Sequence, residues 1–580
     1  MAEKIVSPGV FSRENDISFL TPAAAEVSTA VVGPTVKGPV NIPTVVRSYS
    51  EYVAVYGDAF KSGSDFYQHS TSIAAEKYFE QGGNSLLVTR VAPAGFSSAE
   101  AFIGSGSANS ENTKVLTLET ISEGVLLNSI GGILADGALE SGSVDNLRWE
   151  VTNSNENLGT FGLIVRRGDD NHKSKIILET WNDLSLDPKS DRYVAKIIGD
   201  VSYEAAGGVL TEVGDNPNRS AYIRVKSVDF KTPEYFNTAG VKQYTGKLPV
   251  VGSGSIGGAF ENGAGDLWEA SQEALYFDNI GTNPSTKNTE GLDATGGNAA
   301  DFNEAVALLA NTEEFNFDVL LTPGLNQADH AITVGKFIDL VEERGDAIYV
   351  TDLTGHGDAL STVTGKAEGL NSSFAAAYWP WVKVQSQGLG KQVWVGASAV
   401  MGGVYAFNDS VSDQWFAPAG LVRGGIPGVV RTERKLSRAD RDALYVSKVN
   451  PLATFPGQGV VAYGQKTLQT KASALDRVNV RRLLINLKRF IGGQADNLVF
   501  EQNSIATRNR FLSAVNPYLD LVVQREGLYA YRVVMDDTNN TADVIDRNQL
   551  VGQIYIQPTK TAEFIVLDFV VQPTGASFGA

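Results

Sequence analysis

Apolar and polar residues alternate most regularly toward the end of the chain, where the alternation predicts three strands. Aromatic and β-branched residues recur on one face from Leu528 to Met535, and Gly552 to Gln557 alternates in the same way. A third strand is expected from Glu563 to Val571, with apolar residues on both faces. One of these faces carries Ile565, Leu567 and Phe569. Only a short polar tail, 572–580, follows, so we predict that the unpaired edge joins the sheet of another chain.

The first residues, 1–20, are interpreted as an extended arm. Pro8 favours extended backbone, and Val10 and Phe11 stand just before the polar stretch Ser12 to Asp16. Such an arm either frays, as termini commonly do, or leaves its own subunit as a strand that docks elsewhere. In the second case Val10 and Phe11 take part in the exchange.

Helical and strand patterns alternate in two separated stretches, 21–95 and 298–365, which together predict one α/β domain. The first stretch contains strand-like runs at Glu26 to Val32 and Ser85 to Val91. The second contains helical patterns at 300–314 and 328–344 and buried strands at 317–321 and 347–350. This βαβ order implies a parallel sheet.

The remaining stretches differ from this pattern and predict a multidomain protein that combines α/β with α+β architecture. Short strand candidates among Ser, Asn, Asp and Gly mark 96–260 as a β-rich inserted domain. A glycine- and asparagine-rich linker, 261–297, follows. We assign 366–571 to a C-terminal domain of mixed helices and strands, followed by the tail.

Composition narrows the classes of function that are open to this chain of 580 residues. It has no cysteine and four histidines, which excludes disulfides and leaves little material for a metal or redox enzyme, so no cofactor is expected. The net charge of −18 argues against direct nucleic-acid binding. No apolar run approaches the roughly 18 residues that span a bilayer, and the start lacks a signal-peptide core. We therefore expect a cytosolic protein without membrane insertion.

The segment 421–490 has the opposite charge, with 14 basic and 4 acidic residues. Within it a helix is predicted from Val478 to Ile491, with Asp476 as its N-cap. An apolar stripe faces the core, and four cations gather on a separate face: Arg481, Arg482, Lys488 and Arg489. These cations are predicted to meet an acidic surface outside the helix. The alternative is that Arg481 or Arg482 pairs within the subunit, with Asp476 or Asp440.

Three stretches carry possible catalytic chemistry. Gly252 to Gly257 fits a GxGxxG pattern, but no helix pattern follows it, which argues against a dinucleotide site. Gly459 to Gly464 is one residue out of register for a P-loop and is interpreted as part of a hairpin. Asp352, His356 and Asp358 follow a predicted strand end and could hold a metal in an α/β enzyme. A polar loop is the simpler interpretation, because no nucleophile accompanies them.

Several short motifs together resemble the tail sheath proteins of contractile bacteriophages. They are Ser7-Pro8-Gly9-Val10, Ala417-Pro418-Ala419-Gly420, Asn450-Pro451, Asn479-Val480-Arg481-Arg482-Leu483, Thr538-Asn539-Asn540 and Gln557-Pro558. The resemblance covers the arm, roughly 372–571 and, more loosely, the α/β domain. It does not extend to the inserted region, which carries no matching motif.

The resemblance implies a structural protein without enzymatic activity. Subunits of such sheaths form a helical tube around an inner tail tube, are joined by N- and C-terminal strands, and contract to drive the tube through the host envelope. It implies a C-terminal domain that lines the inside of the sheath, with the tail tube, baseplate and tail terminator proteins as partners. The expected location is the virion tail, after assembly in the host cytoplasm. A type VI secretion or phage-like bacteriocin sheath, and a non-contractile surface-layer or capsid protein, remain alternatives.

Overall fold

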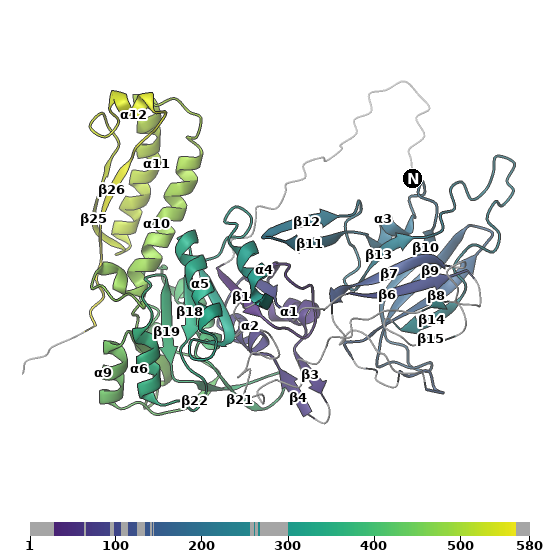
Figure 1. The fold of residues 1–580 in the computed structure, drawn as a ribbon, viewed down its shortest axis with the longest axis horizontal. Coiled ribbons are helices and arrows are strands. Elements are labelled where there is room, and N and C mark those ends of the chain that lie inside the picture. The colour runs from purple at the N-terminus through teal and green to yellow at the C-terminus, as the bar shows by residue number, and fades with distance from the viewer. Residues whose placement is uncertain are drawn as a thin grey trace, which may run out of the picture.

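The computed structural model describes residues 28–563, apart from 63–64, 93–97, 106–113, 124–133, 140–141, 143, 256–259, 262–264 and 267–299. These residues form three parts that follow one another along the molecule (Figure 1). An α/β body lies in the middle, a β-rich region that interrupts it lies at one end, and an upright C-terminal unit lies at the other. No helix in the described part is both long and apolar enough to cross a bilayer.

The body is built on an eight-stranded sheet whose central strands are parallel. Its strands lie in the order β2 (Thr44–Val46), β5 (Leu86–Arg90), β1 (Thr29–Gly33), β17 (Val319–Asn326), β18 (Ile348–Asp352), β19 (Ala375–Trp379), β23 (Val449–Phe455) and β24 (Gly459–Ala462). Ala30 lies opposite Leu87 on one neighbour and Leu320 on the other, so the sheet joins segments from both sides of the insertion. The parallel sheet predicted from the βαβ pattern is confirmed.

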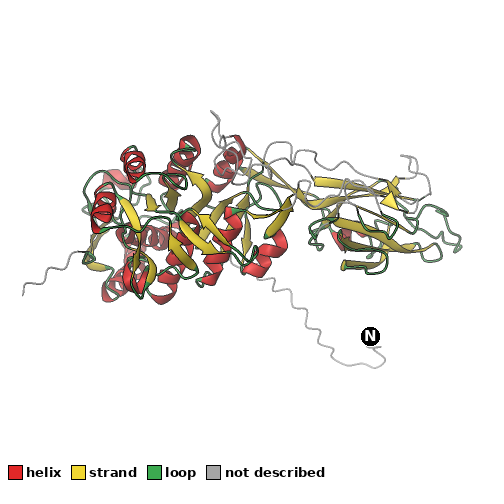
Figure 2. Cartoon of the chain, turned by 90° about the horizontal axis from the view of Figure 1, so that it is seen from below, coloured by secondary structure: helices red, strands yellow, loops and turns green. Residues whose placement is uncertain are grey.

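Helices cover both faces of this sheet, which explains why nearly every residue of its central strands is buried. Figure 2 shows the helices above and below the strands. One core contains residues of α1 (Tyr49–Tyr56), α2 (Ser70–Glu80) and α7 (Ser398–Val411). The core on the other face contains residues of α4 (Ala300–Leu309), α5 (Ala331–Arg344), α6 (Leu360–Glu368) and α9 (Arg438–Val446).

Two small sheets and a short helix complete the body. The hairpin of β3 (Ala59–Ser62) and β4 (Asp65–Gln68) extends from it. A three-stranded sheet is formed by β20 (Val382–Gln385), β21 (Gln392–Val395) and β22 (Val429–Thr432). The short helix α8 (Gly420–Arg423) follows α7.

In the described residues between β5 and α4, the regular structure is almost all strand, and long loops connect the strands. One sheet has the order β10 (Ile177–Ser185), β9 (Thr160–Arg167), β8 (Leu147–Asn155), β14 (Gly252–Ser255) and β15 (Phe260–Glu261). The other has the order β13 (Ile223–Val228), β7 (Lys114–Glu123), β6 (Ser98–Gly104) and β16 (Gly265–Asp266). Both contribute to one core, to which α3 (Val194–Ile198) also belongs. The GxGxxG match therefore begins with a strand, β14, that pairs antiparallel with β8.

A hairpin of β11 (Ser202–Ala206) and β12 (Val209–Val213) connects this region to the body. Its turn, Gly207 and Gly208, donates two backbone N–H groups to the Glu304 carboxylate on α4, at 3.2 and 2.9 Å. Ala205 and Leu210 pack against the core beneath α4. The hairpin is thus anchored by a carboxylate at its tip and by apolar contacts along its sides.

The C-terminal unit contains two long helices and a two-stranded sheet. These are α10 (Val478–Asp496), α11 (Ile505–Gln524), β25 (Leu528–Val534) and β26 (Gln553–Pro558), with the short helix α12 (Ala542–Asp546) between the strands. They share a core with Trp415 and Phe416, which precede α8 in the body. The two strands predicted here from alternation, and the hairpin predicted around Gly459, are confirmed.

Two details of the prediction are wrong. The domain boundary placed at residue 365 cuts through one sheet, because β19, β23 and β24 continue the ladder that starts before it. The N-cap of α10 is Arg477 and not Asp476. Asp476 instead ends a 3₁₀ turn that begins at Ala474 and is capped by the Ser473 hydroxyl, so its side chain does not cap α10.

Candidate assembly surface

The sheet of β25 and β26 is amphipathic, with one face on the helices and the other in solvent. Tyr531 and Val533 lie opposite Ile556 and Ile554, and these four side chains pack into the core beneath the sheet. On the outer face Tyr555 is 57% exposed. The sheet has two strands, so each strand has one edge without a partner among the residues the structure describes. Unpaired backbone groups along such edges can accept a further strand.

The long return between the two strands is held by the side-chain amide of Asn540. Its Oδ1 accepts from the Val551 N–H at 2.9 Å, and its Nδ2 donates to the Val551 carbonyl at 2.8 Å. The preceding Asn539 donates to the Val534 carbonyl at 2.7 Å. The Thr-Asn-Asn motif therefore fixes the far end of the sheet through hydrogen bonds to backbone.

The chain leaves this unit through a strongly fixed point at Glu563, the last described residue. Its carboxylate accepts from Arg477 at 2.6 and 3.0 Å, from the Tyr445 hydroxyl at 2.5 Å and from Gln465 at 3.2 Å. Burial raises the pKa of Glu563, but the hydrogen bonds from Arg477 and Tyr445 outweigh it, and the pKa lies below its usual value. The predicted third strand begins at this anchor, and its residues Ile565, Leu567 and Phe569 lie outside the described residues. The same holds for Val10 and Phe11 of the arm.

The four cations of α10 do not form a free basic face. Arg482 is buried and makes a bidentate ion pair with Asp409 of α7, with distances of 2.8 and 2.5 Å. Arg489 pairs with Asp318 and donates to the Phe317 carbonyl at 3.2 Å. The expectation that these cations lack partners within the subunit is therefore wrong for both arginines. The intramolecular alternative is correct for Arg482, but its carboxylate partner is Asp409.

Arg481 and Lys488 have different surroundings. Arg481 is buried, donates to the Ser373 carbonyl at 3.2 Å and lies 3.9 Å from the centre of the Phe374 ring. Burial lowers the pKa of Arg481 to about 10, with a smaller opposing effect of Glu342. Lys488 is exposed and makes no ion pair with any described residue. That these cations contact a tail tube stays a prediction. Of the four, only Lys488 is exposed and makes no ion pair with a described residue.

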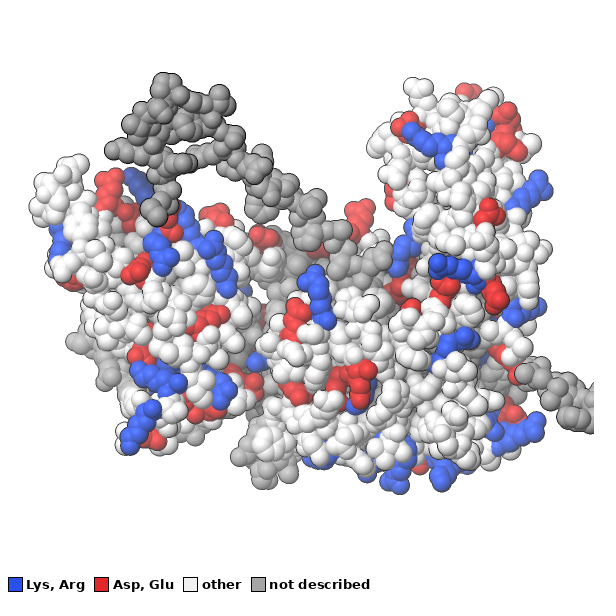
Figure 3. Space-filling model, turned by 180° about the vertical axis from the view of Figure 1, so that it is seen from behind, with Lys and Arg blue, Asp and Glu red and all other residues white. Residues whose placement is uncertain are grey.

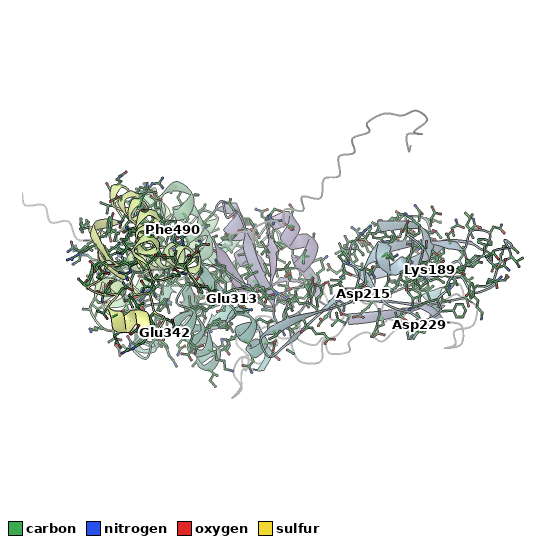
Figure 4. All side chains as sticks on the ribbon, turned by 90° about the horizontal axis from the view of Figure 1, so that it is seen from above. Lys189, Asp215, Asp229, Glu313, Glu342 and Phe490 are labelled. Carbon is green, nitrogen blue, oxygen red and sulfur yellow. The ribbon has the colours of Figure 1, made fainter. Side chains whose placement is uncertain are left out.

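The rest of α10 packs as the apolar stripe predicts. Leu483 and Leu487 are buried in the core of the C-terminal unit. The Phe490 ring stacks on Tyr518 of α11, with 3.7 Å between ring centres, and Figure 4 shows Phe490 among these helices. On the face seen in Figure 3, positive and negative side chains are interspersed over this unit. The net positive charge of 421–490 does not form a continuous basic surface on that face.

The contacts of Asp352, His356 and Asp358 do not support the alternative of a metal site. The two Asp352 oxygens accept from the backbone N–H and the hydroxyl of Ser398, at 3.0 and 2.6 Å. Burial raises the pKa of Asp352 to about 6, although the hydrogen bonds from Ser398 act to lower it. The His356 ring packs 4.8 Å from Trp394, and Asp358 accepts from the Gly355 N–H at 3.1 Å. In the described part of the chain, no three His, Asp or Glu residues are grouped so that they could hold a metal ion.

Comparisons with known proteins agree with the motifs. Residues 294–468 match the family model of the phage tail sheath protein central domain, and 470–572 match that of the phage tail sheath C-terminal domain. The tail sheath protein of Vibrio phage KVP40 is 33% identical over 394 residues, which are 66% of this chain and 55% of the relative. That of Enterobacteria phage T4 is 43% identical over 185 residues, which are 32% of this chain and 28% of the relative. The matches thus span about half or less of these relatives.

A solved structure agrees at the level of the fold. The crystal structure of a sheath tail protein from Listeria innocua matches 92% of this chain and 96% of its own, with a TM-score of 0.51 and 10% identity. The two family models adjoin each other in sequence and cover most of the body after the insertion and the whole C-terminal unit. Together with relatives from several phages, they show that this chain belongs to the family of contractile phage tail sheath proteins.

Proposed function

We propose that this chain is the structural subunit of a contractile tail sheath, which polymerises helically around a tail tube by exchanging terminal strands. The observation that carries the proposal is the β25–β26 sheet, with one face buried and an open edge on each strand among the described residues. Two-stranded sheets are marginal by themselves, and strands from neighbouring copies would complete this one. An exchange that does not close on itself generates an open helical assembly.

In this proposal the exchanged segments are the arm, through Val10 and Phe11, and the last strand, through Ile565, Leu567 and Phe569. The partners are further copies of the chain, the tail tube, and the baseplate and terminator proteins at the two ends. The sheath acts in the virion, after assembly in the host cytoplasm, and contracts to drive the tube through the host envelope. It has no enzymatic activity.

Contraction moves subunits as rigid bodies in this proposal. The ion pairs of Arg482 with Asp409 and of Arg489 with Asp318 connect α10 to the body. The open sheet would then move with the body, while the exchanged strands keep neighbouring subunits attached.

Negative-stain electron microscopy of the purified full chain tests the proposal. We expect striated hollow tubes from the full chain, and soluble subunits with an unchanged circular dichroism spectrum when Met1 to Asp16 is deleted. Leu567→Pro removes a ladder donor and should also abolish tubes, whereas Leu567→Ala keeps the donor and serves as its control. Normal tubes from the truncated chain would refute the exchange of the arm.

A further inference from the structure

A cavity of about 520 Å³ opens where the β25–β26 ladder ends, at the junction of the C-terminal unit and the body. Aromatic side chains from both parts line it, namely Trp415, Phe416 and Tyr529. The ladder ends at the pair Leu528 and Pro558, so a strand added beside β25 would run past the cavity at this end. The cavity is therefore placed to accept a side chain from an added strand.

One buried polar atom in the cavity wall has no hydrogen-bond partner among the described residues. Asn479 is 4% exposed, and its Nδ2 donates to the Trp415 carbonyl at 3.4 Å. Its Oδ1 is buried and accepts no hydrogen bond from any described residue. A buried acceptor left unpaired costs about 1–3 kcal/mol, so a ligand that brings an N–H group would be favoured here. The backbone of an extended chain supplies such a group.

Two cations, Arg423 and Lys560, and one exposed carboxylate, Glu526, line the cavity, so its charged lining is positive on balance. The Arg423 guanidinium lies 4.9 Å from the centre of the Phe416 ring, and the exposed Lys560 also lines the opening. Beside Arg423, Val422 of α8 is 84% exposed. The site thus fits an extended peptide with a large apolar side chain, a backbone donor and a nearby carboxylate.

We propose that this cavity seats Phe11 from the arm of a second copy of the chain, an inference that rests on the strand exchange proposed above. The arm places Val10 and Phe11 together and follows them with the carboxylates of Glu14 and Asp16. In an extended strand Glu14 lies about 10 Å beyond Phe11, close enough to meet the cationic rim. Phe11 fills the aromatic wall, and the arm backbone donates to Asn479.

Cysteine cross-linking tests this placement directly, because the chain has no cysteine of its own. A Phe11→Cys chain is mixed with a Tyr529→Cys chain at a subunit concentration at which a chain without the Phe11 ring still assembles, and the tubes are then oxidised. We expect disulfide-linked dimers, since a disulfide forms only when the Cα atoms lie within about 7 Å. A Phe19→Cys chain mixed with the same partner is the control and should give far fewer. Equal yields from the two mixtures would overturn the placement. A chain that carries both Phe11→Cys and Tyr529→Cys gives a second test. If its disulfide forms only within one chain, the placement in a second copy is also overturned.

The contribution of Phe11 is measured by the critical concentration for tube assembly. Phe11→Ala should raise it about 10- to 100-fold, as expected for losing a buried aromatic side chain. Val523→Trp fills the cavity from the other side and should raise it similarly, provided that its melting temperature is unchanged. Phe11→Ala changes no residue of the cavity, so its result stands even if Val523→Trp fails to fold. If deletion of the arm abolishes assembly but Phe11→Ala leaves the critical concentration unchanged, the cavity assignment falls and strand exchange stands. If the arm can be deleted without effect, both fall.

Discussion

Replacement of Arg482 by alanine tests whether α10 is fixed inside its own subunit. In the structure the Arg482 guanidinium is 2% exposed and joins both oxygens of Asp409, whose side chain is 19% exposed. It also lies 4.9 Å from the centre of the Tyr405 ring, and Tyr405 bonds Tyr378 of the sheet at 3.0 Å. Arg482→Ala would therefore leave a largely buried carboxylate without its cation and loosen the contact between α7 and α10.

The size of the effect follows from the burial of the two partners. Breaking a fully buried ion pair by removing one partner costs about 3–5 kcal/mol. Asp409 retains some contact with water, so we expect the free energy of unfolding to fall by about 2–4 kcal/mol. Asp409→Asn keeps one acceptor and removes the charge, and it should cost less than Arg482→Ala. The exposed Lys488 on the same helix provides the matched control, with an expected change within about 0.5 kcal/mol for Lys488→Ala.

Hydrogen exchange of the isolated, unassembled subunit measures this effect locally. The backbone amides of α10 should exchange faster in Arg482→Ala by the factor that corresponds to the lost free energy, and those of the inserted region should not change. A urea titration of the same variant should show a lower midpoint for the transition of the body and C-terminal unit. If Arg482→Ala left exchange and midpoint unchanged but weakened binding to tail tubes, Arg482 would face a partner and the intramolecular role would be refuted.

Three further predictions concern other parts of the molecule. Lys488→Glu should leave the melting temperature of the subunit unchanged and weaken co-assembly with tail tubes, whereas Arg489→Glu should lower the melting temperature itself because it faces a buried carboxylate. The lowered pKa of Glu563 means that its anchor stabilises the fold above the unfolded pKa of about 4.3 and is lost as pH falls through the folded value. The protection factors of amides in 559–563, measured relative to the intrinsic exchange rate at each pH, should therefore fall in acid, and Glu563→Gln should remove this dependence. Gly208→Ala places a Cβ 2.9 Å from a carbonyl oxygen of α4, whereas Gly207→Ala at a similar positive φ meets nothing. Faster proteolysis of the hairpin in the first variant than in the second would support its docking on the body, and equal rates would contradict it.

The periodic elements could be predicted from the sequence because their burial follows a regular local pattern. In α5, Val334, Phe337, Ile338 and Val341 recur at helical spacing, and all four are buried. The alternation in β25 likewise identifies Tyr531 and Val533 as inward-facing. In these elements each residue's environment is set by the geometry of its own helix or strand, so no knowledge of distant segments is needed.

Partners of charged and polar residues could not be predicted in the same way. Arg482 and Asp409 are 73 residues apart in sequence, and Glu563 meets Arg477 from 86 residues away. Their pairing depends on how helices and loops pack, which local charge counts do not reveal. His356 shows that residues close in sequence need not form one site. It lies near Asp352 and Asp358 in sequence, but its imidazole packs against the rings of Trp381 and Trp394.

The same long-range contacts bear on how a sheath subunit could transmit force. Arg482 joins α10 to α7, and Arg489 joins it to Asp318, the residue directly before β17. Trp415 of the body donates to the Arg525 carbonyl at the end of α11, at 2.9 Å. Glu563 is fixed to Arg477 directly before α10 begins. A pull on the chain beyond Glu563 would therefore be transmitted to α10 and, through the ion pairs of α10, to the body around the central sheet. The force would not depend on the β25–β26 sheet as its only path. In the proposed assembly this path joins an exchanged C-terminal strand to the rigid body of its own subunit, so neighbouring bodies are coupled through the strand.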